Sequence, residues 1–156
     1  MQQEGKLQFT LEIVFWLVTL LVTAGVLYPI YRVAPDYPFW TYNIVFIVVF
    51  ITATRYAFLM KHTWLAFRIP PKIILMVLCV PGIFLLIEGI NYFQTWLDEN
   101  TFDSFLGHLA LERQETMTRY IRSQMIFFGT AAVIGTVTLF LRMVLSIWRN
   151  KNRGTA

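Results

Sequence analysis

Cysteine and charged residues are both scarce in this sequence. Cys79 is the single cysteine, which excludes an intrachain disulfide, a CxxC redox pair and any metal site built from several cysteines. Only 14% of the residues are charged, where a soluble domain carries roughly 25%. Hydrophobic residues make up 57% of the 156-residue chain, and the mean hydropathy is +0.59. A soluble protein of this length could not bury so much apolar surface, so the excess is expected to face lipid.

Histidine and catalytic motifs are also scarce. Neither His62 nor His108 lies in an apolar run, which argues against haem ligation inside a helical bundle. His108 and Glu112 have a spacing that places both on one helical face, but a metal site needs further ligands, and a solvated polar face is the simpler interpretation. The sequence contains no P-loop, GxSxG, HExxH or dinucleotide-binding glycine pattern. We therefore predict no catalytic residue, no cofactor and no metal site, and we expect that the chain is not an enzyme.

Four long apolar runs dominate the sequence, and each approaches the ~20 residues that a helix needs to cross a bilayer. They cover residues 7–27, 39–60, 72–93 and 122–148. The first run is longer than a signal-peptide core and contains Glu12, so we expect it to be retained as a helix. We predict an all-α integral membrane protein, with a four-transmembrane-helix bundle in a single domain over residues 1–156. Pro81-Gly82, near the middle of the third run, predicts a kink.

The segment 94–121, between the third and fourth runs, is the only sizeable polar stretch. Four apolar residues in it follow the i, i+3, i+4, i+7 spacing of one helical face: Phe102, Phe105, Leu106 and Leu109. Polar residues occupy the other side, so we predict an amphipathic extramembrane helix that lies on the membrane or packs over the bundle. Met117, Tyr120 and Ile121 continue a helical spacing, which allows the fourth transmembrane helix to begin before the membrane.

Lys and Arg are distributed unequally between the two sides of the predicted bundle. Seven fall on the side of the termini: Lys6, Lys61, Arg68, Lys72, Arg149, Lys151 and Arg153. Four fall on the opposite side: Arg32, Arg113, Arg119 and Arg122. Because basic residues favour the cytoplasmic side, we expect both termini to be cytoplasmic and the protein to reside in the plasma (inner) membrane. The net charge of +4 is split among these flanks, which favours membrane anchoring over nucleic-acid binding.

Four ionisable residues lie within the apolar runs: Glu12, Arg55, Glu88 and Arg142. Glu12, Arg55 and Arg142 each sit roughly 5–6 residues from the cytoplasmic edge, so their depths agree within ~3 Å at ~1.5 Å per residue. We predict that these three form an intramembrane ionic cluster, because charges inside a bilayer are costly unless they are paired. Two alternatives stay open: each charge extends separately to the headgroups, or the charges take part in moving ions or a substrate. Glu88 is predicted to be an acid near the outer end of the third helix.

Small residues recur in the fourth run. Ala131 and Gly135 form a small-xxx-small pair, with Gly129 close by, and such residues allow helix backbones to approach closely. We predict that this face mediates helix packing, either inside the bundle or with a second copy or a partner protein.

The predicted function rests on the missing catalytic groups and on this packing face. We expect a non-catalytic structural or accessory subunit that lies in the lipid bilayer and associates with other membrane proteins or with itself. The alternative is a small transporter or channel for an ion or small solute. A polar cavity converging on Thr19, Thr52 and Pro81-Gly82 would favour transport, because transport sites lie near the midplane on broken helices. A dry interior would favour the accessory role.

Overall fold

The computed structural model describes residues 2–60, 63 and 69–152. These residues form five helices and no strand: α1 (Gln2–Val33), α2 (Trp40–Leu59), α3 (Ile69–Glu99), α4 (Asp103–Leu106) and α5 (Leu111–Asn152). Four of them, α1, α2, α3 and α5, are long and apolar enough to cross a membrane. The prediction of an all-helical chain with four such helices is confirmed at this level.

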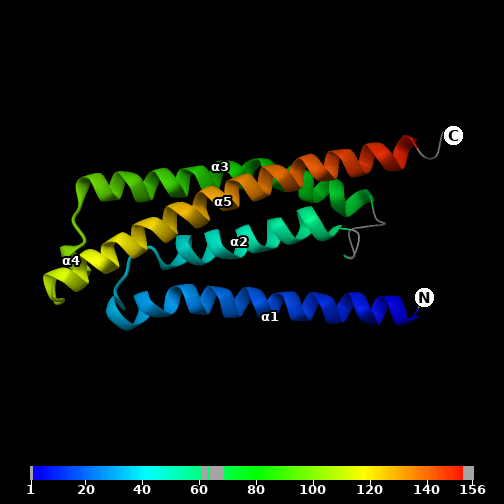
Figure 1. Cartoon of the computed structure of the whole chain (residues 1–156). Helices are drawn as coiled ribbons and strands as arrows, with labels where there is room; N and C mark the ends of the chain where they lie inside the picture. The colour runs from blue at the N-terminus through cyan, green and yellow to red at the C-terminus, as the bar shows by residue number, and fades with distance from the viewer. Residues whose placement is uncertain (1, 61–62, 64–68, 153–156) are drawn as a thin grey trace.

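The four long helices run alternately in opposite directions (Figure 1). α1 begins and α5 ends at one end of the bundle, which we call the terminal end. The turn between α1 and α2 lies at the opposite end together with α4, and we call this the α4 end. α2 and α3 each pack along α5, whereas α1 packs mainly on α2. α2 accordingly lies between α1 and α5 (Figure 1).

The helix bounds differ from the predicted ones at the α4 end. The helix predicted over 94–121 is not a single element: α3 continues to Glu99, α4 is a single turn, and α5 already begins at Leu111. α3 ends at Glu99, and the next residue, Asn100, donates both its backbone N–H and its side-chain amide to the Trp96 carbonyl oxygen. α5 has 42 residues and is therefore ~63 Å long, about twice the ~30 Å thickness of bilayer hydrocarbon.

Two of the helices continue through a proline. The prediction ended the first helix at residue 27, ahead of Pro29, but α1 continues to Val33. A proline near a helix end removes few backbone bonds, and the last turn is closed by the Ala34 N–H, which donates to the Ile30 carbonyl at 2.7 Å. α3 likewise runs through Pro81, and the kink expected there stays a prediction.

The core of the bundle lies along α5. Buried side chains of α2 and α3 meet it in two clusters, one toward the α4 end and one toward the terminal end. The first includes Phe46, Phe93 and Met125, and the second includes Cys79 and Met143. Many of the other large apolar side chains on the four long helices are exposed, as expected for surfaces that face lipid.

Aromatic rings cover the bundle at the α4 end. The Trp96 ring centroid lies 5.2 Å from that of Phe39, 5.7 Å from Phe102 and 5.9 Å from Phe105. Tyr37 packs on Phe105 with the ring centroids 5.8 Å apart. Ring pairs at such distances gain energy beyond their burial. The apolar face expected in the outer segment therefore packs over the bundle, and the polar side of that segment is exposed.

Tyr37 is 2% exposed in this aromatic cluster, and its hydroxyl donates to Met125 Sδ at 3.8 Å. Burial raises the pKa of the Tyr37 phenol above its ordinary value, because the charged phenolate would be poorly solvated there. The phenol is consequently held in its neutral form.

We predict that Tyr37 makes the fold sensitive to alkaline pH. Because its folded-state pKa is raised, the folded chain holds the phenolic proton more tightly than the unfolded chain. The resulting stability is complete below the unfolded pKa of ~10 and is lost as the pH rises above it. Melting temperatures in detergent should fall more steeply above about pH 10 for the unmodified chain than for Tyr37→Phe. Parallel declines in the two proteins would contradict this assignment.

The small residues expected to form a packing face lie where α5 meets α2 and α3. Gly129 and Gly135 are buried, and Ala131 is half-buried. A Cβ atom at Gly129 would lie 2.8 Å from Ile90 Cγ1 on α3 and 3.1 Å from Phe46 Cε2 on α2. Only glycine allows both neighbours to approach the α5 backbone this closely. The two glycines therefore pack inside the bundle.

We predict that Gly129→Ala destabilises the bundle and that Gly135→Ala does not. The added methyl group at position 129 would overlap its neighbours, and overpacking typically costs ~1–3 kcal/mol. At position 135 the methyl group would meet Ala53 Cβ at 3.4 Å, an ordinary contact. Thermal unfolding in detergent measures the difference, and equal melting temperatures for the two variants would count against this packing.

Candidate functional site

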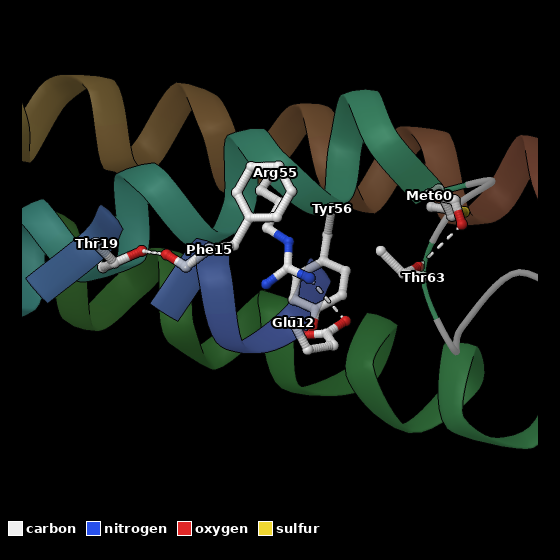
Figure 2. Close-up of polar contacts among 7 residues, drawn as sticks. All are labelled: Glu12, Phe15, Thr19, Arg55, Tyr56, Met60 and Thr63. Carbon is white, nitrogen blue, oxygen red and sulfur yellow. Dashed lines mark hydrogen bonds and ion pairs between the residues drawn. The ribbon is translucent and has the colours of Figure 1, made fainter. Parts of the chain in front are cut away.

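Glu12 of α1 and Arg55 of α2 form an ion pair (Figure 2), with 2.7 Å between Glu12 Oε1 and Arg55 Nη2. The Arg55 side chain is 7% exposed and the Glu12 side chain is 20% exposed. Tyr56, the next residue on α2, donates from its hydroxyl to Glu12 Oε2 at 3.5 Å. Each carboxylate oxygen therefore faces a donor that α2 supplies.

Aromatic rings flank the Arg55 guanidinium (Figure 2). Its Cζ atom lies 4.4 Å from the ring centroid of Phe15 and 5.1 Å from that of Tyr56. Glu12 and Phe15 are three positions apart on α1, so one helical face presents both the carboxylate and the ring to the guanidinium. The carboxylate and the π faces together stabilise a cation that has little contact with water.

A second polar contact holds α1 at the opposite end of the bundle. The Tyr120 hydroxyl of α5 donates to the Val26 carbonyl oxygen of α1 at 2.7 Å. Between this contact and the ion pair, Thr19 and Thr23 donate their hydroxyls to carbonyl oxygens of α1 itself, each at 2.8 Å. Lipid is as apolar as the packed side chains, so polar contacts of this kind add to the packing that holds a helix in place.

Arg142, the third residue of the predicted cluster, does not join the pair. It is half-buried on α5, and no ion pair of Arg142 occurs among the residues that the structure describes. α1 packs mainly on α2, and α2 lies between α1 and α5 (Figure 1). The structure thus brings together two of the three residues, and separate extension of Arg142 to the headgroups stays a prediction.

A groove runs between α2 and α3, because both helices pack on α5 while their backbones stay apart. Its volume is about 790 Å³, and α5 contributes Thr136 and Leu139 to its lining. Glu88 of α3 also lines the groove and is exposed. Within the described part of the chain, no ion pair links Glu88 to a basic residue.

The hydroxyl groups that could serve transport do not converge in this groove. Thr52 and Thr136 line it, but Thr19 is not among the described residues of its lining. Thr136 donates its hydroxyl to the Ala132 carbonyl oxygen at 2.7 Å, and Thr19 donates to the Phe15 carbonyl oxygen at 2.8 Å. Both hydroxyls are therefore satisfied by their own helices. The groove is an apolar cleft rather than a polar cavity.

Sequence reasoning missed several partners in the membrane-level interior. It did not find the rings of Phe15 and Tyr56 around Arg55. Phe15 follows Glu12 by three positions, and this spacing alone indicates that both residues lie on one face of α1. It placed Lys72 only in a basic flank. Lys72 is buried and donates to Ser146 Oγ at 3.0 Å, which joins α3 to α5 near the terminal end.

No protein-family model, curated protein or solved structure matches this chain. In the ranges that the structure describes, no three His, Cys, Asp or Glu side chains are grouped so that they could hold a metal ion. The function is therefore inferred from the geometry of the ion pair and the groove.

We predict that Glu12→Gln lowers the melting temperature of the detergent-solubilised protein. Removing one partner of a buried ion pair typically costs ~3–5 kcal/mol, and we expect ~1–3 kcal/mol because Glu12 is partly exposed and glutamine still accepts a hydrogen bond. A double-mutant cycle with Arg55→Gln isolates the interaction between the two side chains.

Arg142→Gln is the matched control, because Arg142 is expected at a similar depth and has no ion pair among the described residues. It should leave the melting temperature nearly unchanged. Equal losses in Glu12→Gln and Arg142→Gln, or a coupling energy near zero in the cycle, would show that the Glu12–Arg55 pair does not hold the helices together.

Proposed function

We propose that this chain is a non-catalytic accessory subunit of a membrane assembly. In this proposal it is a multi-pass protein of the plasma (inner) membrane, has both termini in the cytoplasm, and associates with other membrane proteins. The observation that carries the proposal is the apolar character of the groove between α2 and α3. A transport site near the midplane needs polar groups that replace the hydration of its cargo. Here the Thr19 and Thr136 hydroxyls are satisfied by carbonyl groups of their own helices.

The membrane-level charges also favour a structural role. Glu12 and Arg55 neutralise each other and join two helices. A passing ion would have to displace one member of this pair, and leaving the other buried and unpaired is strongly unfavourable. The pair is therefore better suited to holding α1 in place than to binding an ion transiently.

The projecting start of α5 supplies a surface that partners could contact outside the membrane. Five charged side chains are exposed there: Glu112, Arg113, Glu115, Arg119 and Arg122. A hollow of about 590 Å³ lies between this part of α5 and the segment around Asp103. Surfaces that mix both signs of charge give association its specificity. The excess of Lys and Arg toward the terminal end supports a cytoplasmic location of both termini.

The proposal predicts association with partners through this charged surface. Extracted from its host membrane in mild detergent, the protein should migrate as an assembly larger than the detergent complex of one 18.3 kDa chain. The double variant Arg119→Glu/Arg122→Glu should release it from that assembly. Arg32→Glu is the control, because Arg32 is an exposed arginine near the same end but on α1. Recovery of the unmodified chain as a monomer would contradict the accessory role.

The same proposal predicts that the protein does not transport ions. Purified protein in liposomes should leave the proton and potassium leak at the level of protein-free liposomes, because the groove lacks a polar path. A leak that the protein introduces and that Thr52→Val abolishes would favour the transporter instead.

A further inference from the structure

The length and lining of the groove between α2 and α3 suit an extended apolar chain. The lining extends from Thr41 to Tyr56 on α2 and from Leu75 to Gly89 on α3. At ~1.5 Å per residue the groove is ~21 Å long, and its volume is about 790 Å³. Most of the lining is apolar, so a hydrocarbon chain with carbon contacts at ~4 Å can lie along it.

Small residues keep the groove open. Ala53, Cys79 and Gly82 all contribute to its lining. A Cβ atom at Gly82 would meet nothing within 4 Å, so the α3 backbone borders open space there. Unfilled space inside a bilayer forfeits dispersion contacts on every side. Such a groove is therefore expected to hold an apolar chain from the surrounding membrane.

A charge lies toward the α4 end of the groove. Among the described residues of the lining, Glu88 alone is charged. Its neighbour Gly89 lies level with Tyr42, because a Cβ at Gly89 would be 2.9 Å from Tyr42 Cδ1. Tyr42 follows Trp40, the first residue of α2, by two positions, so Glu88 lies close to the end of α2, where aromatic residues are typical of the headgroup level. A carboxylate at this depth is stabilised by a cation.

We propose that the groove binds one acyl chain of a phospholipid whose primary-amine headgroup, as in phosphatidylethanolamine, pairs with Glu88. The apolar lining holds the chain, and the carboxylate selects the headgroup. A primary ammonium group offers three N–H donors to a carboxylate, whereas a choline group has the positive charge without such a donor. A phosphatidylglycerol headgroup leaves the lipid anionic, and Glu88 repels it. The site is independent of the proposed accessory role.

Native mass spectrometry of the purified protein with defined lipids tests the proposal. The probes are dioleoyl phosphatidylethanolamine, dioleoyl phosphatidylcholine and dioleoyl phosphatidylglycerol at equal concentration. The unmodified chain should retain one phosphatidylethanolamine per protein, in about tenfold preference to the other two lipids, as a charge-assisted hydrogen bond would give. Equal retention of the three lipids would overturn the proposal.

Variants of Glu88 test the headgroup contact. Glu88→Gln should reduce the preference for phosphatidylethanolamine to near parity with phosphatidylcholine. Glu88→Lys should reverse the preference in favour of phosphatidylglycerol. Glu88 is exposed, so both variants should fold, and their melting temperatures check this. An unchanged preference in both variants would show that Glu88 does not select the headgroup.

A matched pair of glycine variants tests the chain contact. Gly82→Trp places a large side chain where the groove is open and should abolish the retained lipid. Gly25→Trp is the control, because a Cβ at Gly25 of α1 also meets nothing within 4 Å and Gly25 is not among the described residues of the lining. Equal retention by the two variants would mean that the lipid is an annular one bound outside the groove, and this would overturn the proposal.

Photo-crosslinking from Leu78, a residue of the groove lining, is a separate test of the occupant. The crosslinker should label lipid. Labelling of a second protein chain instead would overturn the proposal.

Discussion

The packing of α2 and α3 along α5 is the contact on which the rest of the molecule depends. Lipid competes for apolar surface as well as another helix does, so helices in a bilayer associate by close approach and by polar contacts rather than by expelling water. Gly129 permits that approach, because Phe46 and Ile90 reach the α5 backbone there. α2 and α3 both follow α5 while their backbones stay apart, and the space left between them is the groove. The core and the groove are thus two results of the same packing.

α1 is held in a different way. Many of its large apolar side chains are exposed. Leu27 and Ile30 are buried in the core, and the Glu12–Arg55 pair and the Tyr120 hydroxyl add polar contacts. Such polar contacts are directional, whereas apolar contacts along two smooth helices are not. A shift of α1 by one residue would turn Glu12 by about 100° and break the pair. We therefore expect the ion pair to favour one register of α1 against α2.

Much of the architecture could be predicted because the lipid environment allows few backbone conformations. A run of about 20 apolar residues has to satisfy its backbone internally, and the helix is the form in which it does so. Depth along these runs also placed Glu12 and Arg55 at the same level. Depth does not reveal which helices are neighbours, and Arg142 lies on α5, which α2 separates from α1. The groove depends entirely on this order of helices, so the sequence pattern did not reveal it.

The ends of the helices were harder to predict than their middles, for a local reason. At the α4 end the chain leaves the apolar runs, and local side-chain contacts accompany the helix ends, such as the hydrogen bond from the Asn100 side-chain amide to the Trp96 carbonyl oxygen. The burial of Phe102 and Phe105 against Trp96 depends on rings that come from different segments. The helical spacing of apolar residues identified the apolar face of segment 94–121 correctly. It did not show that this segment is divided between α3, α4 and α5.

α5 has a mechanical consequence because it is one unbroken helix of 42 residues. Side chains hold it along most of its length: Tyr120 bonds to α1 near one end, and Ser146 accepts a hydrogen bond from Lys72 of α3 near the other. Its start extends past the other helices at the α4 end (Figure 1). Because a helix fixed at two such distant points resists tilting, a partner that contacts this start meets a surface whose direction is set by the whole bundle.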